Sequence, residues 1–174
     1  SFGGTTAASF ALNHPDKTAG LLFLASATHP WPGGKSSWYY ELTARPVIGK
    51  IFVHGFAWLG GKLRMKAATA CVFSPNPVPE GYIRGASIEL VLRPRNFEAN
   101  ALDVEGLYRH NLQAQKRYGE ITAPTVIISG DMDTVVLEEI HSAGLARDIR
   151  GSKLIWVKNL GHKPEWIVPE LAVA

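Results

Sequence analysis

Hydrophobic residues gather in three short continuous runs, each bounded by turn residues, at 20–26, 125–130 and 153–158. A continuous apolar run of this length is typical of a strand that helices cover on both faces. Residues 137–149, between the second and third runs, place apolar side chains at helical spacing and end before a glycine. A helix between two such strands indicates a crossover, so we expect three parallel strands.

The segment between the first and second predicted strands has a different character. It opens with a turn-rich aromatic stretch and continues with helical patterns that prolines interrupt, including an amphipathic pattern at 99–119. A further helix is expected at 5–13. The pattern therefore predicts an α/β fold in which residues 1–27 and 121–174 form the core and residues 28–120 form a helical cap inserted after the first strand.

Composition and charge narrow the possible functions. The 174 residues carry a formal net charge of +3 without a run of like charges, which argues against a nucleic-acid-binding arm. The single cysteine, Cys71, excludes an intramolecular disulfide and a cysteine-cluster metal site, and we expect it to be buried. No metal-binding histidine motif occurs, so we expect neither a metal nor a cofactor.

The most apolar stretch, residues 46–63, is interrupted by two lysines, a histidine and four glycines. It is too broken to span a bilayer, although its mixture of lysines and apolar residues leaves an interfacial contact with lipid open. The sequence begins inside structured chain, with no signal-peptide pattern in view, and we expect a cytoplasmic protein.

Side chains that can act as an acid or a base follow two of the predicted strands, and a possible nucleophile precedes the first helix. Functional groups of parallel sheets gather beyond the carboxyl ends of the strands. The turn after the second strand holds Asp131 and Asp133, the loop after the third holds His162, and Ser1 stands directly before the first helix. A nucleophile, an acid and a base are thus expected at one edge of the sheet.

The order serine, aspartate, histidine and the three surrounding motifs resemble the α/β-hydrolase family of serine hydrolases, which includes esterases and lipases. "SFGG" is similar to the serine end of the nucleophile elbow, "GDMDTVV" to the acid turn and "NLGHKP" to the histidine loop. The resemblance covers essentially the whole chain, entered at the nucleophile. It implies Ser1 as nucleophile, His162 as base, Asp133 as acid with Asp131 second, and the Phe2 N–H as an oxyanion donor.

The sequence departs from the family pattern upstream of Ser1. The glycine two residues before the serine, its strand and the loop with the second oxyanion donor are not in this sequence. We therefore expect part of a larger enzyme with an unpaired edge at strand 20–26, and little activity from this chain alone, since losing one oxyanion donor costs about 10²–10³ in rate. Gly3 and Gly4 are expected to permit close approach of helix and strand.

Four residues are candidates for lining a substrate pocket, because they follow the first strand or carry aromatic rings in the cap: His29, Trp31, Trp38 and Tyr39. The favoured function is hydrolysis of a small carboxylic ester through an acyl-enzyme. Hydrolysis of a C–C or amide bond by the same triad stays open, as does a catalytically incompetent hydrolase-like piece that serves as a binding or scaffold element.

Overall fold

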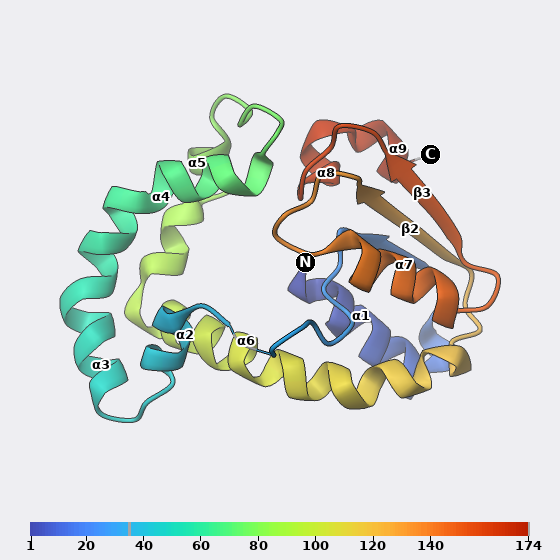
Figure 1. Ribbon diagram of the computed structural model, residues 1–174, viewed down its shortest axis with the longest axis horizontal. Helices are drawn as coiled ribbons and strands as arrows, with labels where there is room; N and C mark the ends of the chain where they lie inside the picture. Colours follow the sequence, from blue (N-terminus) through green and yellow to red (C-terminus); the bar gives the residue numbers. More distant parts are fainter. Residues whose placement is uncertain (35, 174) are drawn as a thin grey trace.

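The computed structural model describes residues 1–34 and 36–173 of the chain, which form a three-stranded sheet and a set of helices (Figure 1). The strands are β1 (Leu21–Leu24), β2 (Thr125–Gly130) and β3 (Lys153–Val157). The α-helices are α1 (Phe2–Asn13), α2 (Trp38–Thr43), α3 (Ile48–Phe52), α4 (Trp58–Phe73), α5 (Tyr82–Gly85), α6 (Pro94–Ala114), α7 (Glu138–Asp148), α8 (Pro164–Ile167) and α9 (Pro169–Val173). Shorter turns are the 3₁₀ segments η1 (Pro15–Lys17), η3 (Ile88–Leu92) and η4 (Gln115–Glu120) and the π-helical η2 (Val53–Ala57).

The sheet has the order β1-β2-β3 and all its pairs are parallel. Phe23 is in register with Ile127, and Ile127 with Leu154. The side chains of Phe23 and Ile127 are buried in one cluster with residues of α1, α6, η4 and α7, so these helices share one face of the sheet. In Figure 1 the strands lie between α7 and the pair α8 and α9. β1 is an edge strand, and its Leu22 side chain is 44% exposed.

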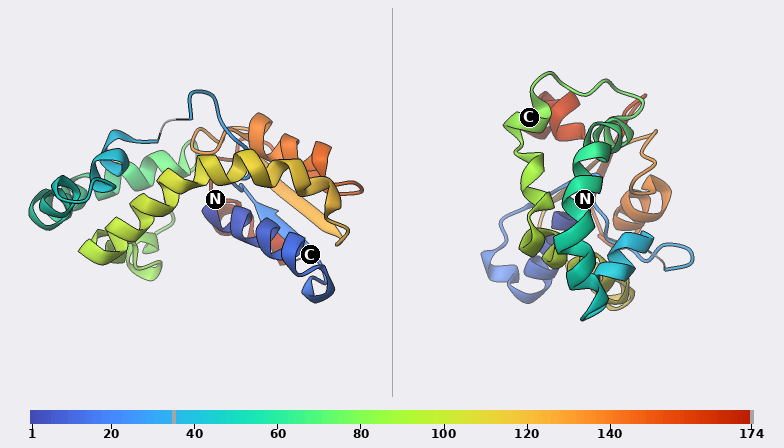
Figure 2. Two further views of the ribbon diagram at one scale, coloured as in Figure 1. Left: turned by 90° about the horizontal axis from the view of Figure 1, so that it is seen from below. Right: turned by 90° about the vertical axis from the view of Figure 1, so that its left-hand side faces the viewer.

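The segment between β1 and β2 projects away from the sheet. Figures 1 and 2 show α2, α3 and the start of α4 at the end of the molecule opposite the strands. The rest of α4 and α6 run back toward the strands. Ala114 at the end of α6 and Tyr118 in η4 are buried in the main core, so the last part of this segment packs with α1 and the sheet. The division into a core and a cap at residues 28–120 stays a prediction.

The predicted α/β architecture with three parallel strands and a helical insertion after the first strand is confirmed. The first strand is shorter than expected, and α1 begins at Phe2 rather than at residue 5. The expectation that Cys71 is buried is wrong, because this side chain is exposed. Thr69 and Phe73 face inward, and each is two residues from Cys71. Two residues span about 200° of an α-helix, so the Cys71 side chain points outward. No helix in the part of the chain that the structure describes is long and apolar enough to cross a membrane.

The two glycines at the start of α1 have different surroundings. A Cβ on Gly4 would collide with the Ser26 side chain just after β1, whereas a Cβ on Gly3 would meet nothing within 4 Å. We expect Gly4→Ala to lower the free energy of unfolding by about 1–3 kcal/mol through overpacking. Gly3→Ala should instead raise it by as much as about 1 kcal/mol, because alanine is the better helix former. Urea unfolding of both variants checks this, and equal effects would contradict it.

Candidate active site

A buried aspartate–histidine pair joins the loops that follow β2 and β3. His162 Nδ1 lies 2.8 Å from Asp133 Oδ2, and the two residues are 4% and 3% exposed. The loops can meet because β2 ends at Gly130, where a Cβ would collide with the Leu160 carbonyl oxygen. The Met132 N–H also donates to that carbonyl at 3.0 Å, which ties the acid turn to the histidine loop.

The Asp133 carboxylate is oriented from both of its oxygens. Oδ1 accepts hydrogen bonds from the backbone N–H groups of Val135 and Val136, each at 2.9 Å, while Oδ2 faces His162. A carboxylate oxygen accepts hydrogen bonds, so the contact fits a His162 tautomer with its hydrogen on Nδ1 and Nε2 as the acceptor. This is the tautomer that a general base needs.

Ser1 is held at the carboxyl end of β1. Its N–H donates to the Leu24 carbonyl at 3.2 Å, and its own carbonyl accepts from the N–H groups of Gly4 and Ala27, each at 3.1 Å. Ser1 is exposed and occupies the position before the first turn of α1. The first N–H groups of a helix lack partners within it and carry partial positive charge, and Phe2 provides one of them.

Ser1 also lies near the other two loops. Figure 1 shows the N-terminus beside the connection between β2 and α7, which holds Asp133. The segments that carry Ser1, Asp133 and His162 lie at the carboxyl ends of β1, β2 and β3, which are parallel and so end at one edge of the sheet. The assignment of these three residues as a triad stays a prediction.

Asn76 clamps the histidine loop from the inserted segment. Its Nδ2 donates to the Asn159 carbonyl at 2.9 Å, and its Oδ1 accepts from the Gly161 N–H at 2.9 Å. Gly161 permits the approach, since a Cβ there would collide with the Ser74 carbonyl oxygen. The sequence analysis missed this residue, and the asparagine among the prolines of "SPNPVPEG" is the only local signal for it.

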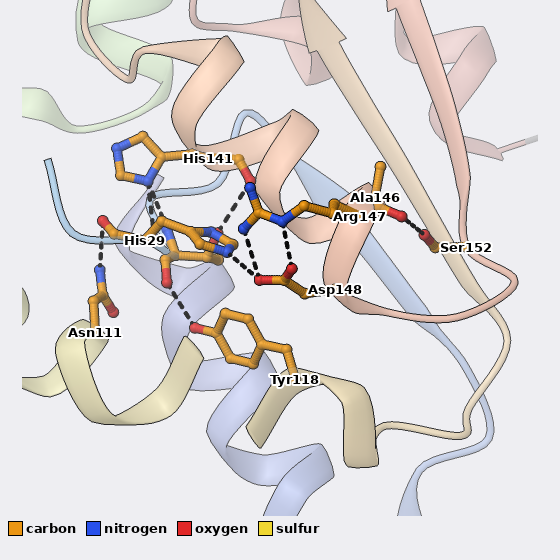
Figure 3. A network of polar contacts seen from close by, with 9 residues as sticks. His29, Asn111, Tyr118, His141, Ala146, Arg147, Asp148 and Ser152 are labelled. Atoms are coloured by element: carbon orange, nitrogen blue, oxygen red, sulfur yellow. Dashed lines mark hydrogen bonds and ion pairs between the residues drawn. The ribbon is translucent and has the colours of Figure 1, made fainter. Parts of the chain in front are cut away.

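His29 is buried under α7 and belongs to the polar network of Figure 3. Its Nε2 lies 3.1 Å from Asp148 Oδ2, and Arg147 pairs with the same carboxylate. Burial lowers the pKa of His29, against the opposite effect of Asp148. The ring packs on Gly144, where a Cβ would come within 2.8 Å of it. The structure thus places this candidate pocket residue, 3% exposed, inside the core.

His141, which the sequence analysis did not assign to the site, holds the segment after β1. Its Nδ1 accepts the backbone N–H groups of Thr28 and His29 at 3.1 and 3.0 Å, as Figure 3 shows for this network. Burial first, and then the neighbouring His29, lower the pKa of His141 to about 4. The neutral imidazole is therefore a fixed acceptor near neutral pH. Since the Ala27 N–H bonds the Ser1 carbonyl, this segment also anchors the candidate nucleophile.

The three aromatic residues predicted to line the pocket, Trp31, Trp38 and Tyr39, do not lie together. Trp31 packs with Leu107 and Val136 beside the acid turn, and its ring centroid lies 5.2 Å from that of Tyr108. Trp38 and Tyr39 contact each other in α2, where they form an aromatic cluster that also contains Tyr40, Phe52 and Phe97. Figure 1 shows α2 far from the strands. The structure therefore brings only Trp31 to the acid turn.

Among residues 1–34 and 36–173 there is no group of three or more histidine, cysteine, aspartate or glutamate side chains that could hold a metal ion.

Comparisons with known proteins identify the fold. No protein-family model matches the chain, and no curated protein does either. Among solved structures, an α/β hydrolase fold protein from Burkholderia ambifaria has a TM-score of 0.71 at 21% identity, over 99% of this chain and 61% of its own. MGS-M2, an α/β hydrolase enzyme from a Medee basin deep-sea metagenome library, has a TM-score of 0.66 at 19% identity, over 100% and 60%.

A thermophilic esterase from Thermogutta terrifontis has a TM-score of 0.64 at 20% identity, over 98% of this chain and 58% of its own. The chain thus spans about 60% of the length of these structures. Similarity at this level of identity shows the fold, which is the one that the three sequence motifs resemble.

Proposed function

We propose that this chain, which has the α/β-hydrolase fold, provides the catalytic triad of a serine hydrolase that cleaves a carboxylic ester. Ser1 is the nucleophile, His162 the general base and Asp133 the residue that orients and stabilises the histidine. The Phe2 N–H contributes one oxyanion donor. Residues 28–120 cap the site, and Asn76 of this segment steadies the histidine loop.

The observation that carries the proposal is the buried pair of Asp133 and His162. A histidine–carboxylate pair also occurs as a purely structural contact, but here the carboxylate is fixed by two backbone N–H groups and the pair lies at the carboxyl edge of the sheet. The segment of Ser1 is held at the same edge by β1 and Ala27. This combination supports acyl transfer rather than a stabilising ion pair.

The roles proposed for Ser1, His162 and Asp133 lead to an acyl-transfer reaction in which the histidine moves the protons. Ser1 Oγ attacks the ester carbonyl while its proton passes to His162 Nε2, and Asp133 stabilises the resulting imidazolium. Negative charge on the carbonyl oxygen is stabilised by the N-terminus of α1. His162 returns the proton to the departing alcohol, which leaves an acyl group on Ser1. Water attacks this acyl-enzyme by the same proton transfers and releases the acid. An ester is favoured because one of the similar structures is an esterase.

A fluorophosphonate probe tests the nucleophile directly, because it forms a covalent bond with an activated serine. We expect the complete gene product to be labelled on the peptide that contains Ser1, as mass spectrometry would locate it. Ser1→Ala should abolish labelling and His162→Ala should reduce it strongly, whereas Ser152→Ala, in the turn before β3, serves as the matched control. Folded protein without any labelling would favour the binding or scaffold alternative.

A further inference from the structure

Only one narrow stripe of residues on α4 faces the rest of the protein. Every fourth residue from 53 to 73 is buried or half-buried, beginning in η2 and ending at the last residue of α4: Val53, Ala57, Gly61, Met65, Thr69 and Phe73. Residues four apart lie nearly above one another on a helix, so this stripe is the contact with the rest of the protein. Apart from the half-buried Val72, the residues of α4 outside this stripe are exposed.

The side of α4 opposite this stripe is apolar and exposed. Residues two positions from the inward ones lie about 200° around an α-helix. In α4 these outward residues include Leu59 and Leu63, which are 58% and 78% exposed. The exposed apolar side chains continue through η2 with Phe56, 68% exposed, and into α3 with Ile51, 64% exposed. We call these four residues, together with Trp58, the outer ridge.

The outer ridge lies in a segment without negative charge. Between Glu41 and Glu80 the sequence has no aspartate or glutamate but five lysines and arginines, all exposed: Arg45, Lys50, Lys62, Arg64 and Lys66. Lys62 and Lys66 flank the ridge on α4, and the Lys62 ammonium lies 4.7 Å from the centre of the Trp58 ring. Long cationic side chains beside a row of exposed leucine and aromatic residues are typical of helices that lie in a membrane interface.

We propose that the outer ridge docks on the surface of an anionic lipid bilayer. The apolar side chains would enter the boundary between headgroups and acyl chains, while the five cations would meet the negative headgroups. The helix would then lie in the plane of the interface. This inference goes beyond the proposed hydrolase chemistry, because it uses none of the residues of the triad.

Charge argues for a membrane over a second copy of this chain. In a symmetric dimer the same surface patch lies on both sides of the contact. The ridge would then bring Lys62 and Lys66 of one copy close to the same two lysines of the other, with no carboxylate from this segment to compensate. Like charges in apposition oppose association. An anionic bilayer supplies both the apolar depth and the negative charge that the surface lacks.

The position of the ridge suits docking without obstruction of the triad. Figures 1 and 2 show α3 and the start of α4, which carry the ridge, at the end of the molecule away from the strands, and only the end of α4 at Phe73 approaches the histidine loop. We therefore expect Ser1→Ala to bind vesicles as strongly as the unmodified protein. Loss of labelling by a fluorophosphonate without loss of vesicle binding would separate the two proposals experimentally.

Co-sedimentation with vesicles tests the docking surface. We expect the protein to bind vesicles of phosphatidylcholine with about one third phosphatidylserine, and to bind pure phosphatidylcholine at least about tenfold more weakly. The double variant Leu59→Ser and Leu63→Ser should lower the partition coefficient by more than about tenfold. Lys62→Gln and Lys66→Gln should each lower it about fivefold, and added salt should do the same.

Leu102→Ser is the matched control, since Leu102 is 52% exposed on α6, outside the ridge. It should bind as the unmodified protein does, and circular dichroism should show that all variants keep their helix content. Equal binding to neutral and anionic vesicles, or no binding at all, would overturn the proposal. A dimer that the leucine variant converts to a monomer would show that a second copy covers the ridge instead.

Discussion

Asp133→Asn is expected to lower kcat for ester hydrolysis about 10⁴-fold while the protein stays folded. The amide oxygen of asparagine can still accept the N–H groups of Val135 and Val136. Its NH₂ group then faces His162 Nδ1 and forces that nitrogen to act as an acceptor. The imidazole proton moves to Nε2, so the ring can no longer take the proton of Ser1. Steady-state kinetics on a chromogenic ester measures the loss.

Asp131→Asn is the matched control, because Asp131 lies in the same turn but its side chain is exposed. We expect its kcat to stay within about twofold of the unmodified value, since surface substitutions of this kind disturb little. A large loss with Asp131→Asn and a small loss with Asp133→Asn would reverse the assignment of the acid. Comparable labelling by a fluorophosphonate in both variants would argue that neither carboxylate orients the histidine.

The strands could be predicted because their signals are local, and the candidate triad, which stays a prediction, rests on signals of the same kind. Each strand is a short apolar run, and each triad residue lies within a few residues of a strand end or a helix start. Parallel strands then bring these ends to one edge without further information. Gly3 and Gly4, directly after Ser1, show what such local signals do not reveal. Gly3 and Gly4 are alike in sequence, but only Gly4 faces the end of β1.

The side chains that support the site could not be predicted, because their contacts join distant parts of the chain. Asn76 bonds residues 83 and 85 positions away, and His141 bonds residues 112 and 113 positions away. Periodicity and short motifs carry no information over such separations. The prediction that Cys71 is buried was wrong for a related reason. The composition of α4 does not reveal which side of the helix packs against the rest of the protein.

His141 and its partners fix the segment from Ala27 to His29 from several directions. Thr5 and Asn111 bond the Ala27 carbonyl, Tyr118 donates to the Thr28 carbonyl at 2.8 Å, and His141 accepts the next two N–H groups. Buried backbone groups without partners would destabilise the fold by about 1–3 kcal/mol each. The packing of α7 against the end of β1 therefore depends on a neutral histidine.

Lowering the pH from about 7 to about 4 is expected to remove about 3 kcal/mol of the stability that His141 contributes. Its pKa is about 4 in the folded protein and 6.5 for an ordinary histidine. The unfolded chain therefore binds a proton at a pH where the folded protein does not. This contribution is fully present above the unfolded pKa and is lost as the pH falls toward the folded one. Urea unfolding over this pH range measures it.

Two substitutions separate the titration of His141 from its hydrogen bonds. His141→Asn places an oxygen near the position of Nδ1, so it should keep both N–H bonds and lose the associated dependence on pH. His141→Leu removes the acceptor and should lower the free energy of unfolding by about 2–5 kcal/mol near pH 7, because two buried N–H groups lose their partner. This difference should shrink toward pH 4, where the unmodified protein loses the contribution of its neutral histidine. His29 is also buried with a lowered pKa, and Asp148, Arg147 and Asp133 are charged neighbours of the two histidines. These groups are present in all three proteins, so the difference between the unmodified protein and His141→Asn isolates His141. Parallel stability curves for those two proteins would show that the titration of this histidine does not control the fold.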